Sequence, residues 1–390
     1  MNVPSPLPSL NAFAPADLLS RITGRLKFKP LVYGYANSRV HGLYSRFLTP
    51  EQLHALLTAP GPDAMAELLE RTAYKEDLVA LSLQFKGDDL LELAVSRHFA
   101  RFCKLLLSFS PAEARPVLSA LLGRWDAHNL KVVLLARRQK KPFEQVVPYL
   151  VQAGSMDEER LRAIHAAPSG EEVLHLLRAS SVGRALTETR NGELRAAERL
   201  RKLILSVDSA DSLQPLMDEF DRLVYQFAMR STKGLGDSDS EAVGRMLARS
   251  ADEKNFSTVL RLRTVEAKTS QVRHYLVPGG SIPASKWLEL AQAGPDSPAA
   301  QRLAWRLRCT AALQAYVKDR SLSQFEVALA RLSTEQSVRA FRRSQLSIGV
   351  LVGALMLKEQ EMSNIRKIVR GKSLRLPAAE IEKMLVRVHA

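Results

Sequence analysis

The most constraining feature of this chain is that two sequence patterns each occur three times, in the same order. The first pattern opens a helix and reads LTPEQLHALLTAP at 48–60, MDEERLRAIHAAP at 156–168 and IPASKWLELAQAG at 282–294. In each copy a cap-like residue precedes an apolar i, i+3 pair, and a proline or glycine follows, as a short N-capped helix requires. Repetition of this kind predicts a protein built from similar units.

The second pattern is an acidic residue, two other residues, an asparagine, and apolar residues one, four and five positions later. Its copies start with Asp126 and Asn129, with Asp252 and Asn255, and with Glu361 and Asn364. At i, i+3 the acid and the amide share one helix face, where they can hydrogen-bond beside an apolar stripe that packs inward. We interpret the pairs as buried packing groups, in preference to interface residues or catalytic carboxylates.

The spacing of the copies supports a common origin. Between the first and third copies the first pattern moves by 234 residues (48 to 282) and the second by 235 (129 to 364). From the first copy to the middle copy the first pattern moves by 108 residues and the second by 126. The middle copy therefore holds about 18 additional residues between its two patterns. The polar segment STKGLGDSDS at 231–240 lies in this interval and has the composition of an inserted loop.

These observations predict an all-α chain of three diverged helical repeats that form a pseudo-threefold body. The predicted parts are a Pro-rich N-terminal extension at 1–30 and helical repeats at 31–154, 155–280 and 281–390. Apolar residues recur at helical spacing nearly throughout, and alternating β-branched runs are scarce. Glycines and prolines end the periodic segments, and we expect Gly371 to be a helix C-cap.

Composition limits the partners. Lys and Arg number 56 against 41 Asp and Glu, a net charge of +15 that favours acidic proteins, anionic headgroups or nucleic acid. Only two cysteines are present, too few for a disulfide framework or a multi-thiolate metal site. The longest apolar run, at 346–357, is shorter than the roughly 20 residues that a membrane-spanning helix needs. Any membrane contact is therefore predicted to be peripheral.

No motif for catalysis, cofactor binding or metal binding emerges. Gly371, Lys372 and Ser373 resemble the end of a phosphate-binding loop, but Arg366 stands where that loop needs a glycine. No GxSxG elbow, zinc-spaced Cys–His cluster or complete calcium loop is present. Basic clusters at 137–141 and 342–343 leave a helical-repeat scaffold that binds nucleic acid as an alternative, although they lack interleaved aromatic residues.

Four stretches carry a resemblance to a known family. They are YGYANSRVHGLYSRFLTPEQLHALL (33–57), GRWDAHNLKVVLLAR (123–137), DEKNFSTVLRLR with LVPGGSIP (252–283) and LKEQEMSNIRKIVRGKSLRLP (357–377). In this order they resemble the C subunit of A/V-type rotary ATPases, whose eukaryotic counterpart is the d subunit. The first thirty residues and 138–141 depart from the family pattern.

The resemblance implies an all-helical, funnel-shaped, non-catalytic rotor protein without a cofactor. Such a protein lies on the cytoplasmic face of the membrane, sits on the ring of proteolipid (c/K/L) subunits and receives the central shaft, which is made of the D and F subunits. It transmits torque for ATP-driven proton or sodium transport or for ATP synthesis, and other components of the complex determine the direction and the ion.

Motif positions also imply a set of residues with structural or partner-contact roles. Packing and helix termination are the expected roles of most of them, and direct partner contact is expected of the rest. They are Tyr35, Arg39, Trp125, Asp126, Asn129, Lys131, Asp252, Asn255, Glu361, Asn364, Arg366, Gly371 and Lys372.

Overall fold

All regular secondary structure in the described part of the chain is helical. The structure is a computed structural model that describes residues 29–187, 194–207, 213–235, 237–343 and 346–387. No strand occurs within these ranges. The predicted all-α class is therefore confirmed, whereas the N-terminal extension lies almost entirely outside the described residues.

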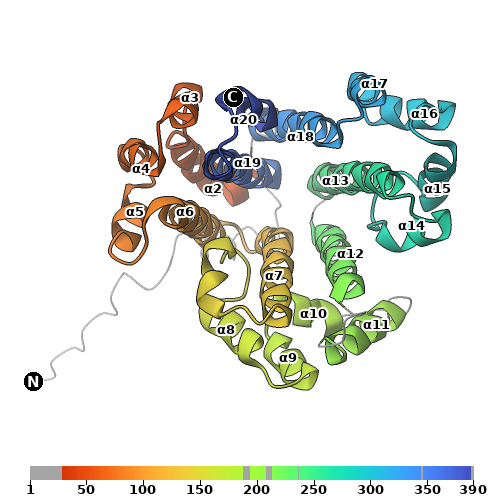
Figure 1. Ribbon diagram of the computed structural model, residues 1–390, viewed down its shortest axis with the longest axis horizontal. Coiled ribbons are helices and arrows are strands. Elements are labelled where there is room, and N and C mark those ends of the chain that lie inside the picture. The colour runs from red at the N-terminus through yellow and green to blue at the C-terminus, as the bar shows by residue number, and fades with distance from the viewer. Residues whose placement is uncertain (1–28, 188–193, 208–212, 236, 344–345, 388–390) are drawn as a thin grey trace, which may run out of the picture.

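The helices follow one another around a circuit (Figure 1). The first group is α2 (Lys29–Tyr44), α3 (Pro50–Thr58), α4 (Pro62–Glu70), α5 (Lys75–Leu81) and α6 (Gly87–Phe109). The second is α7 (Arg115–Arg138), the 3₁₀ turns η1 (Phe143–Gln145) and η2 (Val147–Tyr149), α8 (Glu158–Ala166), α9 (Gly170–Leu177), α10 (Ser181–Thr187), α11 (Leu194–Leu205) and α12 (Leu213–Ser231).

The second half of the chain completes the circuit. It contains η3 (Thr232–Gly234), α13 (Asp237–Thr264), α14 (Thr269–Tyr275), α15 (Ala284–Ala293), α16 (Pro298–Arg306), α17 (Thr310–Asp319), α18 (Leu322–Arg343), α19 (Ile348–Ser373) and α20 (Ala378–Met384). Helix α19 packs against α2, α3 and α6, and α20 packs against α3. The last two helices therefore lie beside the first described helices (Figure 1).

The repeated helix-opening blocks form helices α3, α8 and α15. Thr49 caps α3 in a complete capping box with Gln52, and the Asp157 side chain accepts from the Arg160 N–H at the start of α8. Helix α15 begins after Pro283 without a side-chain cap. A hydroxyl or carboxylate thus satisfies an otherwise unpaired N–H in the first two copies, and the predicted cap is missing in the third.

Three hydrophobic clusters form the core. The first includes residues of α19, of α2–α6, of the first half of α7 and of the first half of α13, where Val243 and Leu247 lie. The second half of α7 packs with α8–α12. The second half of α13 packs with α14–α18. Helix α7 therefore joins the first cluster to the second, α13 joins the first to the third, and α19 connects the C-terminal part of the chain to the first described helices.

Two details differ from the sequence predictions. Gly371 lies inside α19, which ends at Ser373, so it is not a C-cap. A Cβ at Gly371 would lie 2.6 Å from Ile381 Cγ1, so the glycine allows α20 to pack closely. The predicted loop at 231–240 is shorter than expected, because η3 and the start of α13 occupy most of it. The funnel symmetry and the repeat boundaries stay predictions.

Candidate functional site: three acid–Asn pairs and a central cavity

The first acid–Asn pair, Asp126 and Asn129 of α7, holds the backbone of the segment that precedes α8. Asp126 accepts from the N–H of Ser155 at 2.8 Å, from its hydroxyl at 2.6 Å and from the N–H of Met156 at 3.0 Å. Asn129 donates to the Val151 carbonyl and accepts from the Val151 N–H, both at 2.8 Å. Both side chains are fully buried. The pair therefore satisfies backbone groups of an irregular, non-helical segment inside the core.

The second acid–Asn pair, Asp252 and Asn255 of α13, repeats this arrangement. Asp252 accepts from the Ser281 N–H at 2.8 Å, the Ser281 hydroxyl at 2.7 Å and the Ile282 N–H at 3.2 Å. Asn255 exchanges two hydrogen bonds with the backbone of Val277. Burial raises the pKa of Asp252, and the bonds from Ser281 and Ile282 oppose that rise. In both pairs the amide bonds the backbone 22 residues further on.

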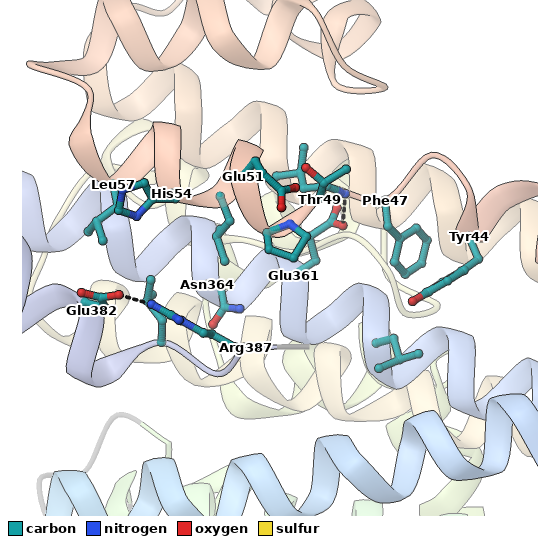
Figure 2. A pocket seen from close by; sticks show the side chains of 15 residues that line it. Tyr44, Phe47, Thr49, Glu51, His54, Leu57, Glu361, Asn364, Glu382 and Arg387 are labelled. Carbon is teal, nitrogen blue, oxygen red and sulfur yellow. Dashed lines mark hydrogen bonds and ion pairs between the residues drawn. The ribbon is translucent and has the colours of Figure 1, made fainter. Parts of the chain in front are cut away.

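The third acid–Asn pair, Glu361 and Asn364 of α19, joins the two ends of the chain. Asn364 again exchanges two bonds with the backbone 22 residues on, at Val386. Glu361, however, accepts from the N–H of Leu48 at 2.7 Å, a residue 313 positions earlier (Figure 2). Leu48 opens the first helix-opening block, as Met156 and Ile282 open the others. The third pair therefore holds the first block.

Glu361 also bonds side chains that have no counterpart in the other pairs. The Tyr74 hydroxyl donates to it at 2.6 Å, and the ammonium group of Lys358 bonds the same oxygen. Lys358 is 1% exposed, and its Nζ lies 4.6 Å and 4.8 Å from the ring centres of Phe47 and Tyr74. Phe47 stands where the other copies have Ser155 and Ser281, so the tyrosine and lysine replace the serine hydroxyl.

Further basic residues of α19 contact the first third of the chain. Arg366 is buried and forms an ion pair with Glu92 at 2.6 Å. Arg370 contacts the same carboxylate at 2.7 Å. Lys372 donates to the Ala59 carbonyl at 2.6 Å. We call the contacts of Glu361, Arg366, Arg370 and Lys372 with residues 48–92 the closing interface. It includes three of the residues that the family resemblance singled out.

A central cavity of about 430 Å³ is lined by residues of α7, α12, α13, α18 and α19. Charged side chains of different helices meet around it. Arg124 pairs with Glu359, and Asp221 accepts from Lys131 and, at 2.9 Å, from Lys254. Burial raises the pKa of Asp221, but Lys254 and Lys131 outweigh it and hold that pKa below its usual value. The cavity therefore has a polar wall of bonded charges.

The remaining predicted residues lie apart from these sites. Tyr35 and Arg39 are exposed on α2, where the Arg39 guanidinium lies 5.9 Å from the Tyr35 ring. Trp125 is half-buried against Phe99, at a ring separation of 5.5 Å. These residues contribute to neither an acid–Asn pair nor the closing interface.

Sequence reasoning missed several residues of these sites. It missed Ser155 and Ser281, although a Gly–Ser pair stands directly before each of the last two helix-opening blocks and was a usable signal. Tyr74, Lys358 and Glu92 belong to no repeated pattern, so nothing in the sequence indicated their role. Among the described residues, no group of three or more His, Cys, Asp or Glu is placed to hold a metal ion.

A family model decides the assignment of the chain. The model for the ATP synthase (C/AC39) subunit matches residues 36–384, which include all three acid–Asn pairs and the central cavity. The chain belongs to the ATP synthase (C/AC39) subunit family. This finding confirms the resemblance that the sequence motifs carried.

Several A-type ATP synthase C subunits are similar to this member of the C/AC39 family along nearly the whole chain. The A-type ATP synthase C subunit of Thermoplasma acidophilum is 23% identical over 90% of this chain and 97% of its own length. The protein of the same name from Haloferax volcanii is 25% identical, with the same coverage. That of Halorubrum lacusprofundi is 26% identical over 85% of this chain and 90% of its own. No helix in the described part of this C/AC39 family member is long and apolar enough to cross a membrane.

Proposed function

We propose that this chain is a non-catalytic central-rotor component of a V/A-type ATPase. It couples a shaft made of the D and F subunits to the membrane proteolipid ring, for ATP-driven proton or sodium transport or for ATP synthesis. The observation that carries the proposal is the central cavity, which draws its lining from helices spread from Leu121 to Ser363 in a chain of the C/AC39 family. The cavity is lined by five helices, so a projecting side chain or loop of a partner that enters it would contact distant parts of the chain at once.

Rigidity supports the coupling role. A protein that transmits torque must not deform between its two partners. The acid–Asn pairs bond each irregular segment to a long helix, and buried, bonded polar groups cost free energy when they separate. The closing interface adds the buried Arg366–Glu92 ion pair between the two ends of the chain.

The same contacts support a non-catalytic role. Asp126 and Asp252 have no exposed surface, and each carboxylate is occupied by three donors from the neighbouring segment. A general base must reach a substrate proton, which these carboxylates cannot do. We propose that the protein works without a cofactor, peripherally on the cytoplasmic face of the membrane, where its charge of +15 attracts acidic partner surfaces.

Filling the central cavity tests the proposal. Ser363 is half-buried on α19 and lines the cavity. We expect Ser363→Trp to abolish capture of the D–F shaft in a pull-down while the melting temperature stays near that of the wild type, because the indole fills the space that the partner needs. Ser108→Trp, at an exposed serine of α6, is the control for adding an indole to a helix.

Three outcomes of these binding experiments separate the rotor role from the nucleic-acid alternative. Loss of shaft capture in Ser363→Trp alone supports the rotor role. Full capture by Ser363→Trp excludes the cavity as the shaft socket. If the wild type captures neither the shaft nor the solubilised proteolipid ring but binds nucleic acid with a steep salt dependence, the rotor role is wrong.

A further inference from the structure

A second cavity, of about 690 Å³, opens where the end of α2 meets the α4–α5 turn and α6. Apart from Lys358 of α19, its lining residues belong to the first group of helices and their connections, and it shares no lining residue with the central cavity. Besides Lys358, which Glu361 neutralises, four cationic side chains line it: Arg46, Arg71, Lys75 and Arg101. They come from the end of α2, the α4–α5 turn and α6, so the folded chain brings together charges from three separate segments.

Three of the four cations have no acidic partner among the described residues. Arg101 bonds Glu76 and, at 2.9 Å, Asp77. Arg46, Arg71 and Lys75 take part in no ion pair and in no side-chain hydrogen bond within the described ranges, and all three are exposed. Three like charges around one cavity repel each other, and a bound anion relieves that repulsion.

The acidic groups near the cavity are already engaged. Glu76 bonds Arg101, and Asp77 is buried and bonds Arg97, Arg101 and His98. Lys358 also lines the cavity, but its ammonium group is neutralised by Glu361. The excess of positive charge around the cavity is therefore carried by Arg46, Arg71 and Lys75.

The uncharged lining indicates the kind of ligand. Phe102 and Leu105 provide an apolar wall, and the hydroxyl of Thr72 is already bonded to the Leu69 carbonyl. The charged donors of the lining that lack an acidic partner among the described residues are therefore Arg46, Arg71 and Lys75. Guanidinium groups bind phosphate through two parallel hydrogen bonds, and a volume of this size is typical of small-ligand sites. The lining lacks the row of aromatic side chains on which successive bases stack in nucleic-acid grooves.

We propose that this cavity binds a phosphate monoester, through Arg46, Arg71 and Lys75. The ester group is either a soluble phosphorylated small molecule or the headgroup of a phosphomonoester lipid. A monoester presents two negative charges and three terminal oxygens, which match three unpaired cations. This proposal does not depend on the rotor function, because none of its residues lines the central cavity.

The test compares two variants with the same change of charge. Arg46→Gln/Arg71→Gln/Lys75→Gln removes the cavity cations. Lys141→Gln/Arg178→Gln/Lys318→Gln removes three exposed cations elsewhere, which serves as the control. The full chain is titrated calorimetrically with two soluble phosphate monoesters, glycerol phosphate and ribose 5-phosphate, at moderate salt. In parallel, flotation is measured with phosphatidylcholine vesicles that contain phosphatidic acid or phosphatidylglycerol.

We expect the wild type and the control to bind and the cavity variant to lose at least about a hundredfold in affinity, given the strength of charge-assisted hydrogen bonds. Binding of the soluble esters identifies a small-molecule site, and binding of phosphatidic acid vesicles alone identifies a lipid headgroup site. The single variant Arg46→Gln, which changes one exposed side chain, gives a second measurement if the triple variant is unstable.

Three results would overturn the proposal. One is the absence of binding to every probe. Another is an equal loss of binding in the cavity variant and the control, which would mean that only the net charge matters. The last is equal binding to phosphatidylglycerol and phosphatidic acid vesicles. The proposed site must prefer phosphatidic acid, because the phosphodiester of phosphatidylglycerol carries only a single charge.

Discussion

At the scale of single residues, two glycines are necessary for the acid–Asn pairs. A Cβ at Gly154 would lie 2.1 Å from Asp126 Oδ1, and a Cβ at Gly280 would lie 2.1 Å from Asp252 Oδ1. Real side-chain contacts are never so close, so each glycine is required by the approach of the carboxylate rather than by the turn itself. The two positions are equivalent in the repeated pattern.

Gly154→Ala is expected to lower the free energy of unfolding by about 2–4 kcal/mol, because the methyl group displaces a buried carboxylate from its donors. Gly280→Ala should cost a similar amount. Urea unfolding measures both. The control is Gly42→Ala in α2, where an added Cβ meets nothing within 4 Å; we expect it to stabilise the protein by about 0.5–1 kcal/mol. A Gly154→Ala protein as stable as the wild type would contradict the role assigned to the glycine.

The sequence predicted the residues of the acid–Asn pairs but not their partners. Asp126 and Asn129 could be found because helical spacing and apolar neighbours repeat locally in three places. The expectation that acid and amide bond each other missed their main contacts, since both reach the backbone of a later segment. That segment consists of turns and bends, which leave no periodic signal in the sequence.

At the scale of elements, the contact between α5 and α6 contains a buried histidine. His98 of α6 bonds Asp77 of α5 at 3.0 Å, and its ring lies 4.1 Å from that of Tyr74. Burial lowers the pKa of His98, and the Asp77 hydrogen bond and charge only partly oppose this. Lys358 lowers it further and Glu361 raises it, so α19 also acts on this contact.

The lowered pKa makes the stability depend on pH. Between the lowered folded pKa and the unfolded pKa of about 6.5, the unfolded state binds more protons at His98 than the folded state. Stability therefore falls as the pH falls through about 6.5, and the loss ends once the pH lies below the folded pKa, where both states are protonated. His98→Gln should reduce the loss of unfolding free energy between about pH 7.5 and about pH 5.5 in urea titrations. The exposed His54→Gln controls for the loss of a histidine. An unchanged pH dependence in His98→Gln would refute this assignment.

The arrangement of the helices also explains why the central cavity was not predicted from the sequence. Its lining comes from five helices, and single residues such as Arg124, Asp221 and Glu359 are far apart in the chain. Each has the sequence context of an ordinary charged residue on a helix surface. Only the packing of the helices brings these residues together. Local sequence patterns therefore contain no signal for this cavity. The helices themselves were predictable because their apolar periodicity and their stops are local.

At the scale of the whole molecule, the closing interface determines whether the circuit of helices is complete. Glu361 holds Leu48, and its partner Lys358 is almost completely buried. Removing one charge of such a pair leaves the other without compensation. The closing interface is therefore the place where one substitution should affect both ends of the chain at once.

Glu361→Gln is expected to cost about 3–5 kcal/mol, because the buried ammonium of Lys358 loses its counter-charge. Hydrogen exchange should accelerate in α3 and α20 and stay slow in α15 and α16, which belong to another core cluster. The double variant Lys358→Met/Glu361→Gln should regain much of the stability. The control is Glu380→Gln, which breaks an exposed pair with Lys383. Uniform acceleration of exchange along the chain would show that the closing interface has no local role.

The closing interface also has a consequence for synthesis on the ribosome. Helices α2–α6 are translated first, yet their hydrophobic cluster includes α19, and Leu48 meets its acceptor only after 313 further residues are made. The N-terminal helices therefore leave the ribosome with an apolar face that has no partner for most of translation. Contacts at such sequence separation slow folding and expose chains to aggregation. The second cluster, completed by α12, is free to form earlier than the first. Folding along the chain therefore starts in its middle and ends where the sequence begins.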